Sequence, residues 1–137
     1  MLKRDKKYLL TLTGLNIIWI FVIFALCAMP SQDIPDPGID IPHLDKVVHF
    51  GMFFIMSLLI CYRYERPCLK RIYGIAIGFS FLYGGLIEIL QHYFFNRGGD
   101  VWDLLADVAG GVTGCLLFPT AKKIEARFLH KKRASSK

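Results

Sequence analysis

The chain opens with a long stretch that carries no charge. Residues 8–29 are 22 consecutive positions without a charged side chain. At about 1.5 Å per residue, a helix of this length crosses a hydrocarbon layer of about 30 Å. Its apolar part is longer than the roughly 7–15 residues usual in a cleaved signal peptide. We therefore expect a retained transmembrane helix.

Three further stretches are nearly as apolar and contain only isolated ionisable residues. They are residues 47–62, 72–95 and 101–118. Hydrophobic residues make up 54% of the 137-residue chain. The sequence predicts an all-α, polytopic membrane protein with four transmembrane helices in a small bundle. Residues 1–121 would form one membrane domain, and residues 122–137 a basic cytoplasmic tail.

The basic residues orient this bundle. Of the 17 Lys and Arg residues, all but Lys46 and Arg97 lie before the first span, between the second and third, or after the fourth. Positive charge stays cytoplasmic, so we expect both termini inside. The net charge of +6 is then a topology signal. The lipid bilayer is the expected partner, and no nucleic acid, because no basic face on a soluble domain is indicated. No oligomeric state is predicted.

Three separate segments place ionisable and polar side chains at the outer end of the predicted spans. The set is Asp45, Lys46 and His49; Glu88 and Gln91; and Arg97, Asp100, Asp103 and Asp107. Helical spacing puts each group on one face. A charge in the bilayer costs about 2.5–3.5 kcal/mol on insertion scales, so these faces should point inward. Gly110 and Gly114 continue the fourth face and predict close helix packing beside a polar cavity.

These residues carry a resemblance. Asp45-Lys46-x-x-His49-Phe50, Glu88-x-x-Gln91 and Arg97-x-x-Asp100-x-x-Asp103, with Asp107 and Gly110, resemble the VanZ-like family of small membrane proteins. The resemblance covers about residues 10–118, including the proline-rich segment 30–42. It implies a cell-envelope protein of the bacterial inner membrane, in a family named for a protein linked to resistance to the glycopeptide teicoplanin. The family commonly has Asn at the position of Asp107, whose role stays open.

The residue types suggest a chemistry for this site. His49, oriented by Asp45, would be an acid, base or nucleophile, with Glu88 and Asp103 as further catalytic carboxylates. Lys46 and Arg97 would hold a phosphate, and Gln91 would help to bind the substrate. Hard oxygen ligands from Glu88, Asp100 and Asp103 would suit Mg²⁺ or Ca²⁺, although no cofactor is required by the pattern. Asp103 is the expected working carboxylate, within reach of Glu88 and His49.

Three readings of function follow from this site. The first is an enzyme acting on a phosphate-bearing envelope lipid; the Ser-Gly-His turn of known lipid phosphatases is absent. The second is a binder or transporter of a lipid or antibiotic, in which the charges serve recognition and proton relay. The third is a structural or assembly protein whose buried charges fix the helix register.

Overall fold

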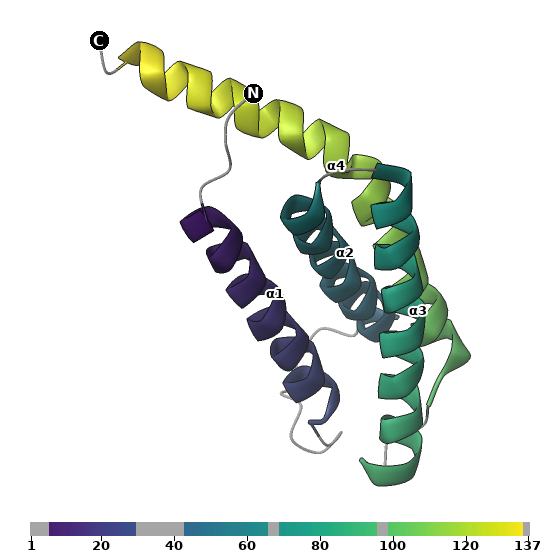
Figure 1. The fold of residues 1–137 in the computed structure, drawn as a ribbon. Helices are drawn as coiled ribbons and strands as arrows, with labels where there is room; N and C mark the ends of the chain where they lie inside the picture. Colours follow the sequence, from purple (N-terminus) through teal and green to yellow (C-terminus); the bar gives the residue numbers. More distant parts are fainter. Residues whose placement is uncertain (1–5, 30–42, 66–68, 96–98, 136–137) are drawn as a thin grey trace.

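The computed structural model describes residues 6–29, 43–65, 69–95 and 99–135. Within these ranges the chain forms four α-helices (Figure 1): α1 (Lys6–Cys27), α2 (Leu44–Tyr64), α3 (Leu69–Phe94) and α4 (Val101–Ser135). Each is long and apolar enough to span a membrane. The predicted all-α, four-span fold is thereby confirmed. The predicted cap over residues 30–42 and Arg97 lie outside the described residues.

The helices extend beyond the uncharged stretches. The first turn of α2 includes Asp45, so this carboxylate has a helical position. The fourth helix continues to Ser135, and the segment predicted as a basic tail is therefore helical that far. Pro119 lies inside α4, and Figure 1 shows that this helix changes direction along its length. A proline removes one backbone hydrogen bond and clashes with the preceding turn, which accounts for such a bend.

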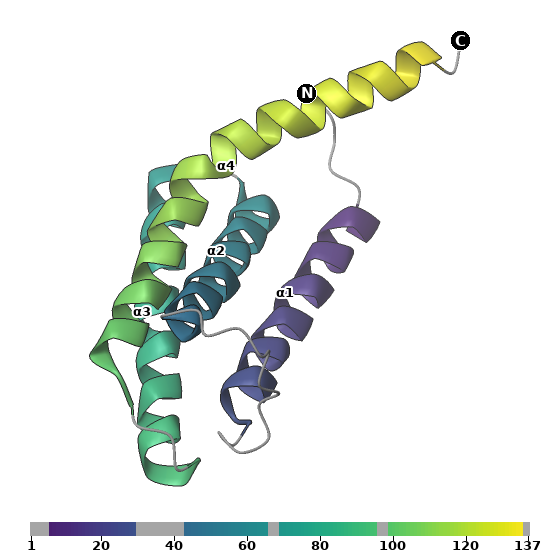
Figure 2. The same ribbon diagram turned by 180° about the vertical axis from the view of Figure 1, so that it is seen from behind.

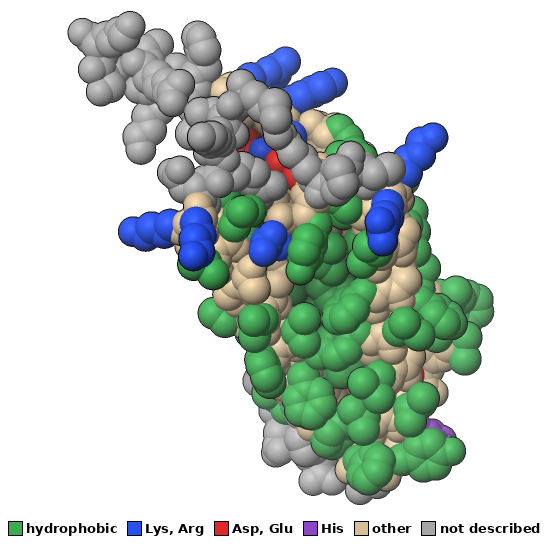
Figure 3. All heavy atoms as spheres, viewed as in Figure 1, with side chains coloured by type: hydrophobic (Ala, Val, Ile, Leu, Met, Phe, Trp, Pro, Cys, Tyr) green, Lys and Arg blue, Asp and Glu red, His purple; other side chains and the backbone are tan. Residues whose placement is uncertain are grey.

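The surface suits a bilayer. Large apolar side chains at mid-depth are open to the surroundings, among them Phe21 on α1, with 67% of its area exposed, and Leu82 on α3, with 71%. Figure 3 shows Lys and Arg gathered around the end of the molecule where the termini lie, above a body covered by hydrophobic side chains. Lipid tails are as apolar as these residues, so exposing them in a membrane costs little.

The closest helix packing joins α2 and α4. A Cβ added to Gly110 would overlap the carbonyl oxygen of Phe50, and one added to Gly114 would come within 2.6 Å of that of Phe54. Both pairs advance by four residues, so the helices run parallel in a fixed register. The predicted close approach at this glycine pair is confirmed. Buried apolar side chains, including Met56, continue the contact toward the C-terminal end of α2.

Helix α1 is attached more loosely and stands to one side of the other three (Figure 2). Its buried residues are Leu12, Ile23 and Cys27. Side-chain donors tie it to its neighbours through backbone carbonyls. Trp19 Nε1 donates to Met52 O at 2.9 Å, Tyr83 Oη to Ile20 O at 2.8 Å, and Gln91 Nε2 to Cys27 O at 3.0 Å.

Candidate functional site

The polar site begins where α4 begins. Asp100 caps this helix: its Oδ1 accepts the N–H of Trp102 at 2.9 Å, and its carbonyl accepts the N–H of Asp103 at 2.9 Å. An aspartate is favoured there because it satisfies a backbone donor that has no partner inside the helix. The backbone N–H of Asp100 in turn donates to Glu88 Oε2 of α3 at 2.8 Å. Glu88 therefore fixes the position at which α4 starts.

Lys46 of α2 joins two of the aspartates. Its ammonium donates to Asp100 Oδ2 at 2.7 Å and to Asp103 Oδ1 at 3.0 Å. Asp103 is buried, whereas the side chains of Lys46 and Asp100 stay about one third exposed. The ammonium, followed by the Trp102 N–H, holds the pKa of Asp100 below its usual range. The sequence placed Lys46 near the aspartates without indicating that it would bridge them.

His49 lies deeper, at the centre of the bundle. Its side chain is 2% exposed. Nδ1 is 3.0 Å from Asp107 Oδ1 on α4 and 3.9 Å from Glu88 Oε1 on α3. Three helices thus each contribute one buried ionisable side chain to one point. The direct carboxylate partner of His49 is Asp107. The sequence had favoured Asp103, one turn earlier in α4, as the working carboxylate.

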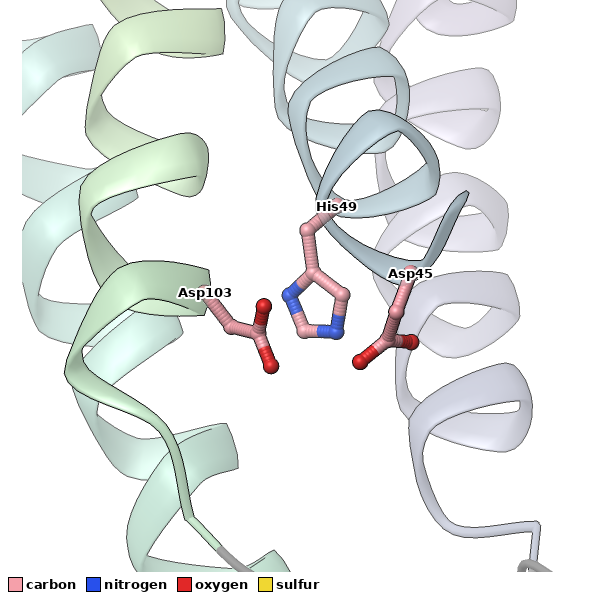
Figure 4. A group of neighbouring side chains, drawn as sticks. All are labelled: Asp45, His49 and Asp103. Atoms are coloured by element: carbon pink, nitrogen blue, oxygen red, sulfur yellow. The ribbon is translucent and has the colours of Figure 1, made fainter. Parts of the chain in front are cut away.

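Figure 4 shows the imidazole of His49 between the carboxylates of Asp45 and Asp103, with one ring nitrogen turned toward each. Ligand-type atoms of these three residues lie within 4.8 Å of one another, and the same holds for His49, Glu88 and Asp107. Asp100 belongs to neither of these two groups. Among the described residues, five carboxylates share the site with one lysine and one histidine, so negative charge is in excess.

The structure brings together most of the predicted site residues. Those that meet where α2 and α4 begin and α3 ends are Asp45, Lys46, His49, Glu88, Asp100 and Asp103. Glu88 and Asp103 face inward, with 9% and 4% of their areas exposed. Gln91 is also buried, but its amide nitrogen faces Cys27 of α1. Arg97 lies outside the described residues.

Asp107 is the site residue whose role the sequence left open. It is completely buried, and its Oδ2 has no hydrogen-bond partner among the described residues. The signal that could have identified it is its place three residues before Gly110. The glycine fixes α4 against Phe50, the neighbour of His49, and the preceding turn of α4 is thereby brought to the imidazole.

A hollow on the outside of the bundle leads to this site. It has a volume of about 360 Å³ and lies between the C-terminal end of α3 and the N-terminal end of α4. Its polar lining consists of Glu88, His92 and Asp100, and its apolar walls include Ile89, Tyr93 and Val101. These apolar side chains are more than half exposed, so the hollow opens on the surface that a bilayer would cover.

Comparison with known proteins supports the assignment suggested by the motifs. The chain is 29% identical over 82 residues to the uncharacterised protein C11E3.10 of Schizosaccharomyces pombe. The matched segment covers 59% of this chain and 50% of the relative. The chain thus spans about half the length of that protein. No solved structure matches the chain. The VanZ/LLP1 family matches residues 3–122, nearly the whole sequence. The chain therefore belongs to the VanZ/LLP1 family of membrane proteins.

Proposed function

We propose that the protein is a membrane enzyme that acts on a phosphate-bearing envelope lipid at the outer end of the bundle. The observation that carries this proposal is the buried pair of His49 and Asp107, 3.0 Å apart, with Glu88 beside it. An imidazole held by carboxylates away from water is typical of sites that move protons or hold a reactive group. Whether His49 moves a proton or holds a reactive group, the reaction would depend on it.

The hollow between α3 and α4 supports a lipid as substrate. A lipid in the outer leaflet could lay its chain against Ile89 and Tyr93 while its headgroup reached Glu88 and Asp100. Such a molecule would not have to leave the bilayer. Sites that take ligands between helices combine apolar walls with a few polar groups in this manner.

The phosphate would be held by cationic groups. Lys46 is one, and a bound phosphate oxygen would take the place of Asp100 or Asp103 at its ammonium. Arg97 remains the predicted second phosphate ligand and Gln91 a predicted substrate contact. A Mg²⁺ or Ca²⁺ ion on Glu88, Asp100 and Asp103 also remains a prediction; the Lys46 ammonium lies on two of these carboxylates.

Location and physiology extend the proposal. With both termini cytoplasmic, the site would face the outside of a bacterial inner membrane, where an envelope lipid of the outer leaflet could reach it. Action on such a lipid would change the susceptibility of the cell to glycopeptides such as teicoplanin.

A second candidate function is the binding or transport of a lipid or antibiotic, with the carboxylates serving recognition and proton relay. The excess of carboxylates over Lys46 and His49 favours it, because buried carboxylates in membrane proteins often mark ion and proton pathways. In this case the site would bind its ligand without turning it over. If the site had only a structural role, changing the chemistry of its side chains without disturbing the fold would leave the function of the protein unchanged.

Release of inorganic phosphate separates these candidates. Purified protein in mixed micelles is given a polyprenyl diphosphate or phosphatidic acid, and the rates of the wild type and His49→Gln are compared. We expect turnover by the wild type and a loss of at least 100-fold in the variant. Glu125→Gln, at the inner end of α4, is the control and should keep the wild-type rate. Lipid binding without turnover would favour the second candidate, and equal rates for His49→Gln and wild type would exclude the proposed function.

A further inference from the structure

We propose that His49, Glu88 and Asp107 form a binding site for a divalent transition-metal ion of the zinc class. The three residues come from α2, α3 and α4, and all are buried. The inference deepens the proposed function, since it concerns the same site and makes His49 the ligand of the reactive group. It differs from the metal set that the sequence suggested, with which it shares only Glu88.

The spacing of the ligand atoms suits one ion. His49 Nδ1 lies 3.0 Å from Asp107 Oδ1 and 3.9 Å from Glu88 Oε1. Bonds of about 2.0–2.2 Å to zinc place neighbouring ligand atoms roughly 3.0–3.5 Å apart. The first separation is already in this range, and a small rotation of the Glu88 side chain brings the second into it.

Two buried oxygens of these carboxylates have no hydrogen-bond partner in the part of the chain that the structure describes. They are Glu88 Oε1 and Asp107 Oδ2. Glu88 Oε1 faces the imidazole nitrogen, which already meets Asp107. A buried charged oxygen without a partner is costly, and sites of this kind usually hold an ion, a proton or a water molecule. A cation between the three side chains would give Glu88 Oε1 a partner and would compensate the negative charge of both carboxylates.

The described cations do not fill this role. The ammonium of Lys46 lies one turn closer to water, on Asp100 and Asp103. A protonated His49 would balance a single negative charge, which leaves one of its two neighbouring carboxylates uncompensated. A divalent ion with a neutral imidazole balances both.

The surroundings hold the proposed ligands in place. The second oxygen of Glu88 accepts the backbone N–H of Asp100 at 2.8 Å, so its rotation is restricted. The imidazole of His49 has Asp45 on the side of its other ring nitrogen (Figure 4). Metal-binding histidines commonly have such a carboxylate, because it fixes the tautomer and the ring orientation.

The chemistry of the ligands indicates the class of ion. Imidazole suits zinc and its first-row neighbours, whereas Mg²⁺ and Ca²⁺ prefer oxygen ligands alone. Three protein ligands leave one position of a tetrahedral ion open. That position could take a water molecule or an oxygen of a lipid phosphate, and the adjacent hollow offers the route to it.

Metal binding is tested on the purified, full-length protein in detergent. The protein is stripped with a chelator, dialysed against Zn²⁺ or Co²⁺, and assayed for bound metal by atomic emission and for the visible absorption of Co²⁺. We expect one ion per chain in the wild type. His49→Gln, Glu88→Gln and Asp107→Asn should each weaken binding at least tenfold. His92→Gln, an exposed histidine on α3, should bind as the wild type does, and Asp103→Asn tests the alternative set of ligands one turn away.

Folding is followed in the same samples. Asp107→Asn keeps the size and shape of the side chain, and metal-free wild type and variant should show the same helical circular dichroism. Added Zn²⁺ should raise the unfolding temperature of the wild type and leave that of the Asn variant unchanged, since an ion stabilises only a fold that binds it.

The outcomes separate the inference from the proposed function. No stoichiometric ion in the wild type, or binding that is lost with Asp103→Asn and retained with His49→Gln, would overturn the metal site. Phosphate release that persists in chelator would then leave the proposed function standing. Stoichiometric binding at these three residues without any phosphate release would keep the metal site and exclude the enzyme.

Discussion

Gly84 of α3 lies against Asp107 of α4, so closely that a Cβ on the glycine would come within 2.5 Å of the carboxylate oxygen Oδ2. A side chain at this position would push Asp107 away from α3. The neighbouring Gly85 has nothing within 4 Å of the same added atom. The two adjacent glycines therefore differ in their packing: Gly84 is buried against the Asp107 carboxylate, whereas Gly85 is partly exposed and has open space beside it.

Gly84→Ala should destabilise the protein by about 1–3 kcal/mol, as overpacking of a filled interior does. It should also weaken metal binding, because Asp107 must move. Gly85→Ala should be neutral or slightly stabilising, since alanine favours the helix. Unfolding by SDS in mixed micelles measures the free energy of both variants. Equal losses for the two would show that Asp107 does not occupy the place described.

Lys46→Met should leave the buried Asp103 without its cation. The variant should lose unfolding free energy, because a buried polar group is left uncompensated. In the double variant with Asp103→Asn the loss should be smaller than the sum of the two single losses. Additive losses in this double-mutant cycle would mean that the two side chains do not interact in the membrane protein.

The Asp100 carboxylate predicts a dependence of stability on acid pH. Its pKa is lowered in the folded state, chiefly by Lys46. Such a group stabilises the fold above the unfolded-state value of about 3.9, and this contribution disappears as the pH falls through the lower folded-state value. Asp100→Asn should therefore lose less stability than the wild type between pH 5 and pH 2 (roughly the window these values set). Identical unfolding profiles of the two proteins across this window would contradict the pairing.

The orientation in the membrane can be tested by cysteine labelling. In a background without the native cysteines, Ser31→Cys should react with an impermeant maleimide in intact cells. Lys132→Cys should react only after permeabilisation, because 15 of the 17 basic residues fall on its side. The opposite pattern would invert the topology and place the polar site at the cytoplasmic face.

The sequence was sufficient for the spans and for the inward direction of the charges. Uncharged stretches long enough for a bilayer leave few alternatives to helices, and carboxylates such as Glu88 and Asp103 can be accommodated only inside the bundle. The glycine pair Gly110 and Gly114 likewise predicted a close contact of α4 with another helix. These features depend on single helices or on the solvent, and periodicity is enough to reveal them.

The pairing of side chains between helices could not be read in the same way. Asp100, Asp103 and Asp107 share one helical face, so periodicity gives their direction but not the depth at which each meets α2. That depth is set by the contact of Gly110 with Phe50, which depends on both helices together. The sequence therefore favoured Asp103 as the partner of His49, whereas the structure pairs Asp103 with Lys46 and His49 with Asp107.

The loose attachment of α1 has a consequence for biogenesis. This helix leaves the ribosome first, yet it contacts the rest through a few buried side chains and donors on other segments, such as Tyr83 and Gln91. Those donors exist only once α3 has been inserted. Helices that are stable individually in lipid can associate later, and interhelical hydrogen bonds in membranes are worth about 0.6–2 kcal/mol each. Trp19 of α1 can bond to Met52 as soon as α2 is inserted, whereas the bonds from Tyr83 and Gln91 must wait for α3. The docking of α1 is therefore completed only after α3 has been made.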